Sequence, residues 1–140
     1  MCNSPNQRIM VIDDEGPLAA SVKRILECQG YSVVIHDGGP GCCNEVMRFK
    51  PDLVLIDVNM PFLSGDAFVQ LFRPRPGMCE ATIVLYSGID EVELKRKALE
   101  CGAHGYISKL DSRLEFSRKV AGYLQNELQE EYSPDAKANL

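Results

Sequence analysis

Short apolar runs alternate along the chain with longer segments whose apolar residues recur at helical spacing. Five runs have the length and composition of β-strands: Arg8–Ile12, Ser32–Ile35, Leu53–Ile56, Thr82–Tyr86 and Gly105–Ile107. The first, third and fourth are apolar at successive positions, whereas a sheet with one face in water would alternate apolar and polar residues. The pattern therefore predicts parallel strands that helices cover on both faces.

A helical segment follows each run, and glycine and proline mark several helix ends. The first helix has Pro17 near its start and stops at Gly30, a residue that tolerates the left-handed conformation of helix ends. The second ends before Pro51, the third ends ahead of Pro74, and Gly102 closes the fourth. The second to fifth helices are expected at about Cys42–Phe49, Gly65–Phe72, Asp90–Cys101 and Ser112–Glu130.

Five βα units with short links predict an α/β fold of three layers, with right-handed crossovers and helices on both sides of the sheet. In such sheets the functional site lies beyond the carboxyl ends of the strands. The chain has 140 residues, 45% of them hydrophobic and 25% charged, which suits one globular domain. We expect the domain at residues 8–130, with residues 1–7 as an N-terminal extension and 131–140 as a tail or a cut linker.

Charge and hydropathy argue against two classes of partner. The formal net charge of −5 provides no general attraction for phosphate backbones, so direct nucleic-acid binding is not expected. The longest uninterrupted apolar runs have four or five residues, far below the roughly 20 that span a bilayer. The start of the chain, Met1 to Gln7, lacks the pattern of a secretory signal, and a cytoplasmic location is expected.

Six cysteines raise the question of a disulfide or zinc framework. The chain has no Cys-x-x-Cys pair and no histidine at ligand spacing from a cysteine, which disfavours both. Cys28 and Cys101 occupy apolar helical positions, where a free thiol behaves as a small buried hydrophobe. We therefore predict buried free thiols at these two positions.

Carboxylates stand at the ends of two predicted strands. Asp13 and Asp14 follow the first strand, and Asp57 follows the third. If these strands are neighbours, the carboxylates converge, and two of them about 4 Å apart repel by roughly 4 kcal/mol at an effective dielectric constant of 20. Mg²⁺ would relieve this repulsion, and an aspartate beside it can attack a phosphoryl group. Taken alone, Asp13 and Asp14 fit solvated helix-capping acids equally well.

The remaining strand ends carry a hydroxyl and an amine. Ser87 and Gly88 end the fourth strand, and Ser108 and Lys109 follow the fifth. A lysine ammonium there would neutralise phosphoryl oxygens as a point charge. Each residue taken singly is also compatible with an ordinary loop position.

Four sequence blocks together resemble the bacterial two-component response-regulator receiver domain of the CheY-like superfamily, over about Arg8 to Glu130. The blocks are Ile9-Met10-Val11-Ile12-Asp13-Asp14-Glu15, Pro51-Asp52-Leu53-Val54-Leu55-Ile56-Asp57-Val58-Asn59-Met60-Pro61 with Ser64-Gly65, Ser87-Gly88, and Cys101-Gly102-Ala103-His104-Gly105-Tyr106-Ile107-Ser108-Lys109. Any one block is weak, but four in this order and spacing are specific. The resemblance implies a flavodoxin-like (βα)5 sandwich with strand order 2-1-3-4-5.

The resemblance also implies a role for each matching residue at the metal site. Asp57 would be the phosphoacceptor and a Mg²⁺ ligand. Asp14 would bind Mg²⁺ directly and Asp13 mostly through water. The backbone carbonyl of Asn59 would supply a further ligand.

A second group of matching residues would sense the phosphoryl group. Lys109 would pair with it, Ser87 would donate a hydrogen bond to it, and Tyr106 would turn inward as Ser87 moves. The signalling face would be the fourth helix, the fifth strand and the fifth helix. Simple packing of Tyr106 against the fourth helix is the alternative.

Two positions depart from, or vary within, the pattern of the family. Most receivers have a proline after the lysine, joined by a cis peptide bond, but here Leu110 follows Lys109. Because a cis bond before a residue other than proline costs about 3–4 kcal/mol, we predict a trans bond. Ile89, two residues beyond Ser87, cannot orient water, and we therefore predict slow loss of the phosphoryl group.

The resemblance implies a signalling protein rather than an enzyme that converts a metabolite. Its partners would be a sensor histidine kinase or phosphotransfer protein, an output protein or domain, and in one arrangement a second copy that binds on phosphorylation. A hydrolase of the haloacid dehalogenase type is a second hypothesis, but it needs an acid where Asn59 stands. A receiver-shaped interaction module that is never phosphorylated is the third.

Overall fold

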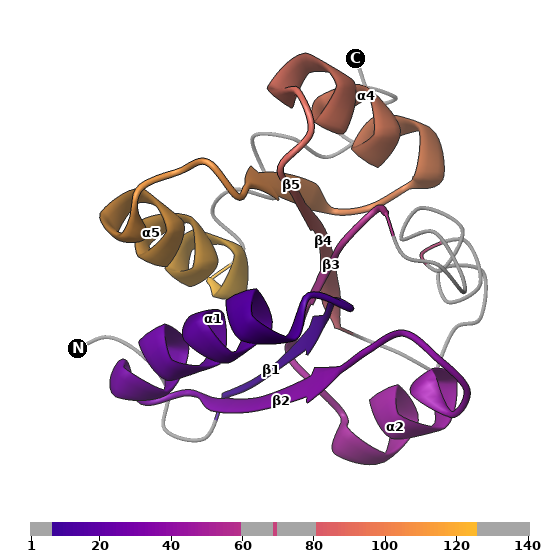
Figure 1. The fold of residues 1–140 in the computed structure, drawn as a ribbon, viewed down its shortest axis with the longest axis vertical. Helices are drawn as coiled ribbons and strands as arrows, with labels where there is room; N and C mark the ends of the chain where they lie inside the picture. Colours follow the sequence, from indigo (N-terminus) through magenta and orange to yellow (C-terminus); the bar gives the residue numbers. More distant parts are fainter. Residues whose placement is uncertain (1–6, 60–68, 70–80, 126–140) are drawn as a thin grey trace.

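Five parallel strands form one sheet at the centre of the molecule (Figure 1). The computed structural model describes residues 7–59, 69 and 81–125. The strands lie in the order β2-β1-β3-β4-β5, which confirms the predicted flavodoxin-like topology. Their bounds are β1 Arg8–Ile12, β2 Ser32–His36, β3 Leu53–Ile56, β4 Thr82–Ser87 and β5 Gly105–Ser108.

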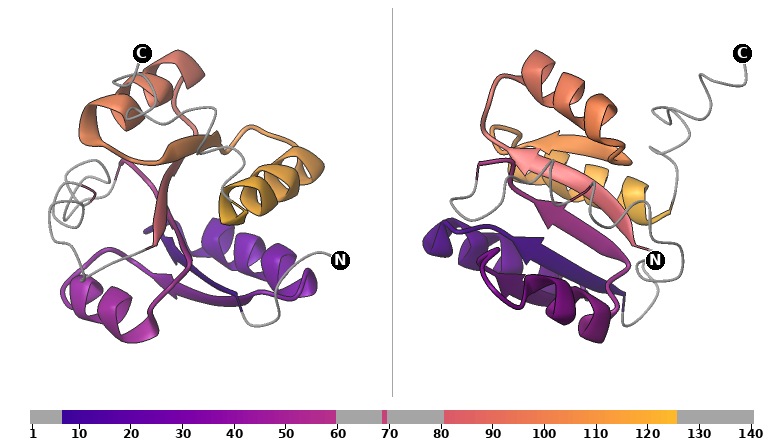
Figure 2. Two further views of the ribbon diagram at one scale, coloured as in Figure 1. Left: turned by 180° about the vertical axis from the view of Figure 1, so that it is seen from behind. Right: turned by 90° about the vertical axis from the view of Figure 1, so that its right-hand side faces the viewer.

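Helices cover both faces of the sheet, α1 and α5 on one and α2 and α4 on the other (Figures 1 and 2). Their bounds are α1 Gly16–Cys28, α2 Cys42–Phe49, α4 Glu91–Cys101 and α5 Arg113–Leu124. The helix predicted at about Gly65–Phe72 lies outside the described residues except for Val69, which is helical and fully buried. The predicted extension of the last helix to Glu130 also lies outside them.

Local signals explain where these helices begin and end. Asp90 caps α4 by accepting the Val92 and Glu93 N–H groups, and Ser112 caps α5 by accepting an N–H at 3.1 Å. Lys50 caps the end of α2; its φ of 55° is left-handed, and a proline follows it. Gly102 closes α4 with a φ of 85°, as predicted.

Alternation along the strands separates two cores. The α1–α5 core joins one set of strand side chains to α1 and α5: Ile9, Val11, Leu53, Leu55, Val84, Tyr86 and Ile107 with Ala19, Val22, Leu26, Phe116, Val120 and Tyr123. The α2–α4 core joins the other set to α2 and α4: Met10, Ile12, Val54, Ile56, Ile83 and Leu85 with Cys42, Val46, Leu94, Ala98 and Cys101. Successive side chains at a strand end therefore point alternately to one core and to the other, and we call this alternation the parity of a position.

Three details test the predictions from the sequence. β2, β4 and β5 each run one residue further than predicted, because His36, Ser87 and Ser108 still pair with neighbouring strands although they are polar. The peptide bond between Lys109 and Leu110 is trans, as predicted. The prediction of a buried Cys28 is wrong: Cys28 is exposed, since α1 turns its 19, 22 and 26 positions inward.

None of the helices in the described part of the chain combines the length and the apolarity needed to cross a bilayer.

Candidate functional site: an acid–lysine cluster at the carboxyl edge of the sheet

Three aspartates converge at the carboxyl ends of β1 and β3. The two strands pair in parallel up to Ile12 and Ile56, so the residues that follow lie side by side. The Asp57 N–H donates to the Ile12 carbonyl at 3.0 Å, which fixes this juxtaposition. One carboxylate oxygen from each of Asp13, Asp14 and Asp57 lies within 4.8 Å of the others. Asp13 and Asp57 are only 2% and 5% exposed, whereas Asp14 faces solvent.

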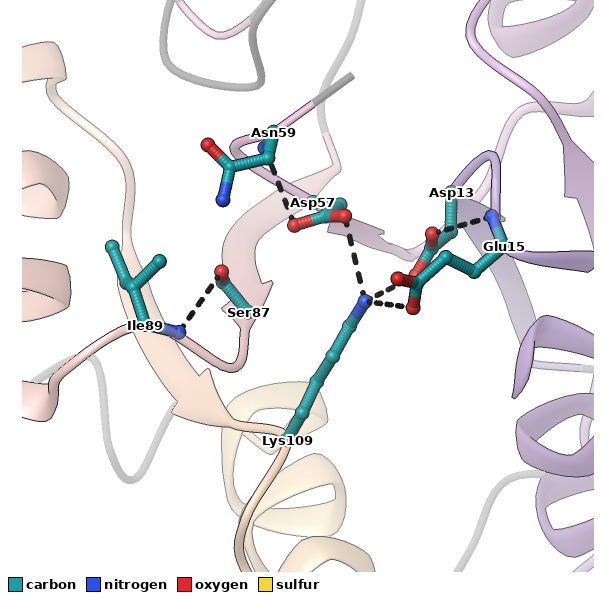
Figure 3. Close-up of polar contacts among 7 residues, drawn as sticks. All are labelled: Asp13, Glu15, Asp57, Asn59, Ser87, Ile89 and Lys109. Atoms are coloured by element: carbon teal, nitrogen blue, oxygen red, sulfur yellow. Dashed lines mark hydrogen bonds and ion pairs between the residues drawn. The ribbon is translucent and has the colours of Figure 1, made fainter. Parts of the chain in front are cut away.

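Lys109 reaches into this group from the end of β5 (Figure 3). Its Nζ lies 2.7 Å from Asp13 Oδ2, 3.4 Å from Asp57 Oδ2 and 3.4 Å from Glu15 Oε1. The Lys109 N–H donates to the Ser87 carbonyl at 2.8 Å, which ties the base of the side chain to β4. We call Asp13, Asp14, Asp57 and Lys109 the acid–lysine cluster.

Burial and nearby charges shift the pKa values of Asp57 and Lys109. Burial raises the pKa of Asp57 and the charge of Asp13 adds to this, while Lys109 and the Asn59 N–H act in the opposite direction. Burial alone would lower the pKa of Lys109, but the bond to Asp13 and the charges of Asp57, Asp13 and Glu15 together raise it. A net raised pKa on Asp57 means that one ammonium does not fully offset the cost of a buried carboxylate here.

The charge balance and the ligand types of the cluster fit a divalent cation. The carboxylates of Asp13, Asp57 and Glu15 contact the ammonium of Lys109, and that of Asp14 lies within 4.8 Å of the first two. Carboxylate oxygens are hard ligands, and Mg²⁺ commonly uses one or two of them together with water and a phosphate. Asp13, Asp14 and Asp57 are therefore the residues suited to hold Mg²⁺.

The other predicted residues border the cluster without joining it. Ser87 is buried at the end of β4, and its Oγ accepts the Ile89 N–H at 3.4 Å (Figure 3). The Asn59 N–H donates to Asp57 Oδ1 at 3.3 Å, so the backbone of this loop lies close to the carboxylate.

Tyr106 lies on β5 and is half-buried against the α2–α4 core. Burial raises the pKa of its phenol, with Glu91 and Asp111 adding to the effect and Lys119 opposing it. This placement is compatible with an aromatic switch and with simple packing against α4.

Two contacts of Lys109 were missed by the reasoning from sequence. Glu15 belongs to the acidic block after β1, but only the structure shows its carboxylate on the lysine. Tyr86 lies beneath the lysine, with its ring centroid 5.7 Å from Nζ. Parity on β4 gave a signal for the second contact, since Tyr86 points to the face opposite Ser87.

A doubly wound fold with acids on β1 and β3, a hydroxyl on β4 and a lysine on β5 defines the class of receiver domains. The model of the family described as response regulator receiver domain matches residues 9–120. The chain belongs to this family, which serves two-component signalling systems.

Relatives and solved structures agree with this membership. The chain is 31% identical over 120 residues to the alkaline phosphatase synthesis transcriptional regulatory protein PhoP of Bacillus subtilis, covering 86% of this chain and 49% of that protein. It is 29% identical over 119 residues to the phosphate regulon transcriptional regulatory protein PhoB of Klebsiella pneumoniae, covering 85% and 52%. The chain thus spans about half the length of these relatives.

Among solved structures, the signal receiver domain of the response regulator NarL from Mycobacterium tuberculosis superposes with a TM-score of 0.77 at 26% identity, covering 87% of this chain and 98% of that chain. A CheY-like receiver domain protein from Methanospirillum hungatei gives 0.75 at 25% identity, covering 89% and 98%.

Proposed function

We propose that the chain accepts a phosphoryl group on Asp57, with Mg²⁺ bound at the acid–lysine cluster, from a histidine kinase or phosphotransfer protein in the cytoplasm. The observation that carries the proposal is the position of Asp57. It is 5% exposed, its carboxylate is within 4.8 Å of those of Asp13 and Asp14, and it contacts the Lys109 ammonium. A carboxylate that contacts an ammonium and lies beside two further carboxylates suited to Mg²⁺ has the surroundings that a phosphoryl acceptor needs.

The transfer itself needs little covalent chemistry from the protein. A carboxylate oxygen of Asp57 bonds to phosphorus while the bond from phosphorus to the donor's imidazole nitrogen breaks, and the imidazole takes up a proton. Mg²⁺, when bound, neutralises charge on the transferring oxygens. Lys109 would contribute a second positive charge, and Asp13 and Asp14 would hold the metal.

Residues on the α2–α4 side of the sheet would then respond to the phosphoryl group. The Ser87 hydroxyl would turn from the Ile89 N–H toward the new oxygens, and Tyr106 would follow it. Such a change would alter the face made by α4, β5 and α5, for an output partner or for a second copy of the chain. We propose residues 8–130 as the unit that does this, with residues 1–7 and 131–140 outside it. Water would later hydrolyse the aspartyl phosphate.

Incubation with acetyl phosphate and Mg²⁺, followed by intact mass, tests the proposal directly. The wild type is expected to gain the mass of one phosphoryl group, and Asp57→Ala is expected to gain none. Asp52→Ala is the matched control, because Asp52 is an exposed acid at the opposite end of β3 and should leave uptake unchanged. Uptake that survives in Asp57→Ala contradicts the assignment, and a wild type that takes up nothing favours the interaction module. Multiple turnover of a phosphate ester would favour the hydrolase.

A further inference from the structure

The connection from β5 to α5 is organised around the hydroxyl of Ser108. The Leu110 N–H donates to Ser108 Oγ at 3.0 Å, and the Asp111 N–H donates to the Ser108 carbonyl at 3.2 Å. These two bonds close a turn that begins at Ser108 and has Lys109 at its second position. A backbone N–H occurs at this place because residue 110 is not a proline.

Ser108 is nearly fully buried, at 5% exposure, and pairs in register with Ser87. Because the Ser108 hydroxyl is buried, its hydrogen bond to the Leu110 N–H cannot be replaced by a bond to water without cost. The rest of the connection is fixed by other groups: Asp111 pairs with Lys119 at 2.8 Å, and Ser112 caps α5. The Ser108 hydroxyl is therefore the side chain that shapes the turn at Lys109 itself.

The path of the Lys109 side chain depends on this turn. Only 10% of the side chain is exposed, and its Nζ lies 5.7 Å from the centroid of the Tyr86 ring and 2.7–3.4 Å from three carboxylates. The backbone N–H of Lys109 bonds to the carbonyl of Ser87 on one side, and the turn fixes the chain on the other. A shift of the backbone here would move the ammonium relative to all three carboxylates at once.

We propose that Ser108 is a positioning residue, which acts through the turn to hold the Lys109 ammonium against Asp13 and Asp57. The expected effect of Ser108 on the rate rests on the proposed phosphoryl transfer. Its expected effect on the position of the Lys109 ammonium does not.

The first experiment compares rates of phosphoryl uptake from acetyl phosphate. Ser108→Ala is expected to slow uptake by about two- to tenfold, the range that the loss of one ordinary hydrogen bond spans. Ser108→Thr keeps the hydroxyl and should restore the rate. Ser112→Ala removes an equivalent hydrogen bond from the same connection, and should leave the rate unchanged because it caps α5 only. A Thr variant as slow as the Ala variant, or a slow Ser112→Ala, would overturn the proposal.

The second experiment asks whether Ser108 acts through Lys109. In a Lys109→Ala background, Ser108→Ala should cause no further loss, since the group it positions is gone. The ammonium itself can be followed by its ¹H–¹⁵N NMR signal, assigned by its absence in Lys109→Ala. This signal should weaken or shift in Ser108→Ala and persist in Ser112→Ala.

The outcomes separate this inference from the proposed function. An unchanged ammonium signal and an unchanged rate in Ser108→Ala would refute the positioning role and leave phosphoryl uptake standing. A wild type that takes up no phosphoryl group would refute the proposed function, and the NMR signal would still decide whether Ser108 positions Lys109.

Discussion

Ile89 follows β4 by two residues. Its side chain is half-buried and packs against the α2–α4 core. Its N–H donates to the hydroxyl of Ser87, so Ile89 lies beside the side chain that we propose to hydrogen-bond the phosphoryl group. An apolar side chain there can neither orient a water molecule nor accept its proton. We therefore expect Ile89→Glu to lose its phosphoryl group about tenfold faster than the wild type, less than the full effect of a positioned general base.

The measurement is the decay of the phosphorylated protein after acetyl phosphate is removed, followed by intact mass. Ile89→Gln is the matched variant, because it can orient water but cannot take a proton at neutral pH. A Glu variant that decays at the rate of the wild type, or more slowly, would show that Ile89 does not limit access of water.

Cys42 offers a residue-level test of the α2–α4 core. Burial raises the pKa of its thiol from its ordinary value near 9 to about 12, with Cys43, Asp37 and Glu45 adding to the shift. Between these two values the unfolded chain loses the proton while the folded chain keeps it, so stability is complete below pH 9 and falls as the pH rises toward 12. In urea unfolding, the free energy of unfolding of the wild type should fall more steeply with pH across this window than that of Cys42→Ala. The difference in slope should be up to about 1.4 kcal/mol per pH unit. Equal alkaline slopes for the two proteins would contradict the burial of this thiol.

The principal site residues could be predicted because strand ends meet at one edge of a parallel sheet. Asp13, Asp57 and Lys109 needed only the strand order to be brought together. The contacts of Glu15 and Tyr86 depend on which way a long lysine side chain turns after it leaves β5. The spacing of residues along β4 and β5 places Tyr86 on the same face of the sheet as Lys109, but it carries no signal for the contact with Glu15.

At the level of elements, α5 packs closely on β5 at Gly105. A Cβ built on Gly105 would lie 2.0 Å from the Tyr123 hydroxyl. That hydroxyl accepts the Tyr106 N–H at 3.1 Å and donates to the Tyr106 carbonyl at 3.2 Å, so α5 is joined to the backbone of β5. We expect Gly105→Ala to lower the free energy of unfolding by about 1–3 kcal/mol, because a well-packed contact is overfilled.

Urea unfolding monitored by circular dichroism measures this effect. Gly16→Ala is the control, since no atom lies within 4 Å of a Cβ at that helical position. It should be neutral or slightly stabilising. A Gly105→Ala variant as stable as the control would mean that the ring of Tyr123 moves aside at little cost.

The elements themselves were predicted well where burial sets the pattern and less well where polar residues continue it. Parallel strands buried on both faces left apolar runs that could be recognised directly. The last residue of β2, β4 and β5 was missed because it is polar and held only by pairing with a neighbour. Cys28 was placed inside because hydrophobicity was counted without the angular position of the residue on α1.

At the scale of the whole molecule, the sheet separates the two cores, and the site lies at its carboxyl edge, where residues from both faces come together. Asp13, Asp57 and Lys109 continue the parity of the α1–α5 core, while Ser87 and Tyr106 continue that of the α2–α4 core. A phosphoryl group on Asp57 would thus lie between the two layers. Phosphorylation of Asp57 could therefore alter side-chain packing on both faces of the sheet.

If the acid–lysine cluster binds Mg²⁺ as proposed, the stability of the molecule should depend on the concentration of this cation. Among the described residues, Lys109 is the cation that opposes the repulsion among these carboxylates when no metal is bound. A ligand that binds only the folded state should then add about 2.7 kcal/mol at a hundredfold excess over Kd. For a chain of this size, that raises Tm by roughly 8 °C. Asp14→Asn removes one charge and one ligand together. It should therefore raise Tm in EDTA and lose most of the response to Mg²⁺, with NaCl of equal ionic strength as the control. A wild-type Tm that ignores Mg²⁺, or an equal rise in Asp14→Asn, would exclude a metal site that uses Asp14.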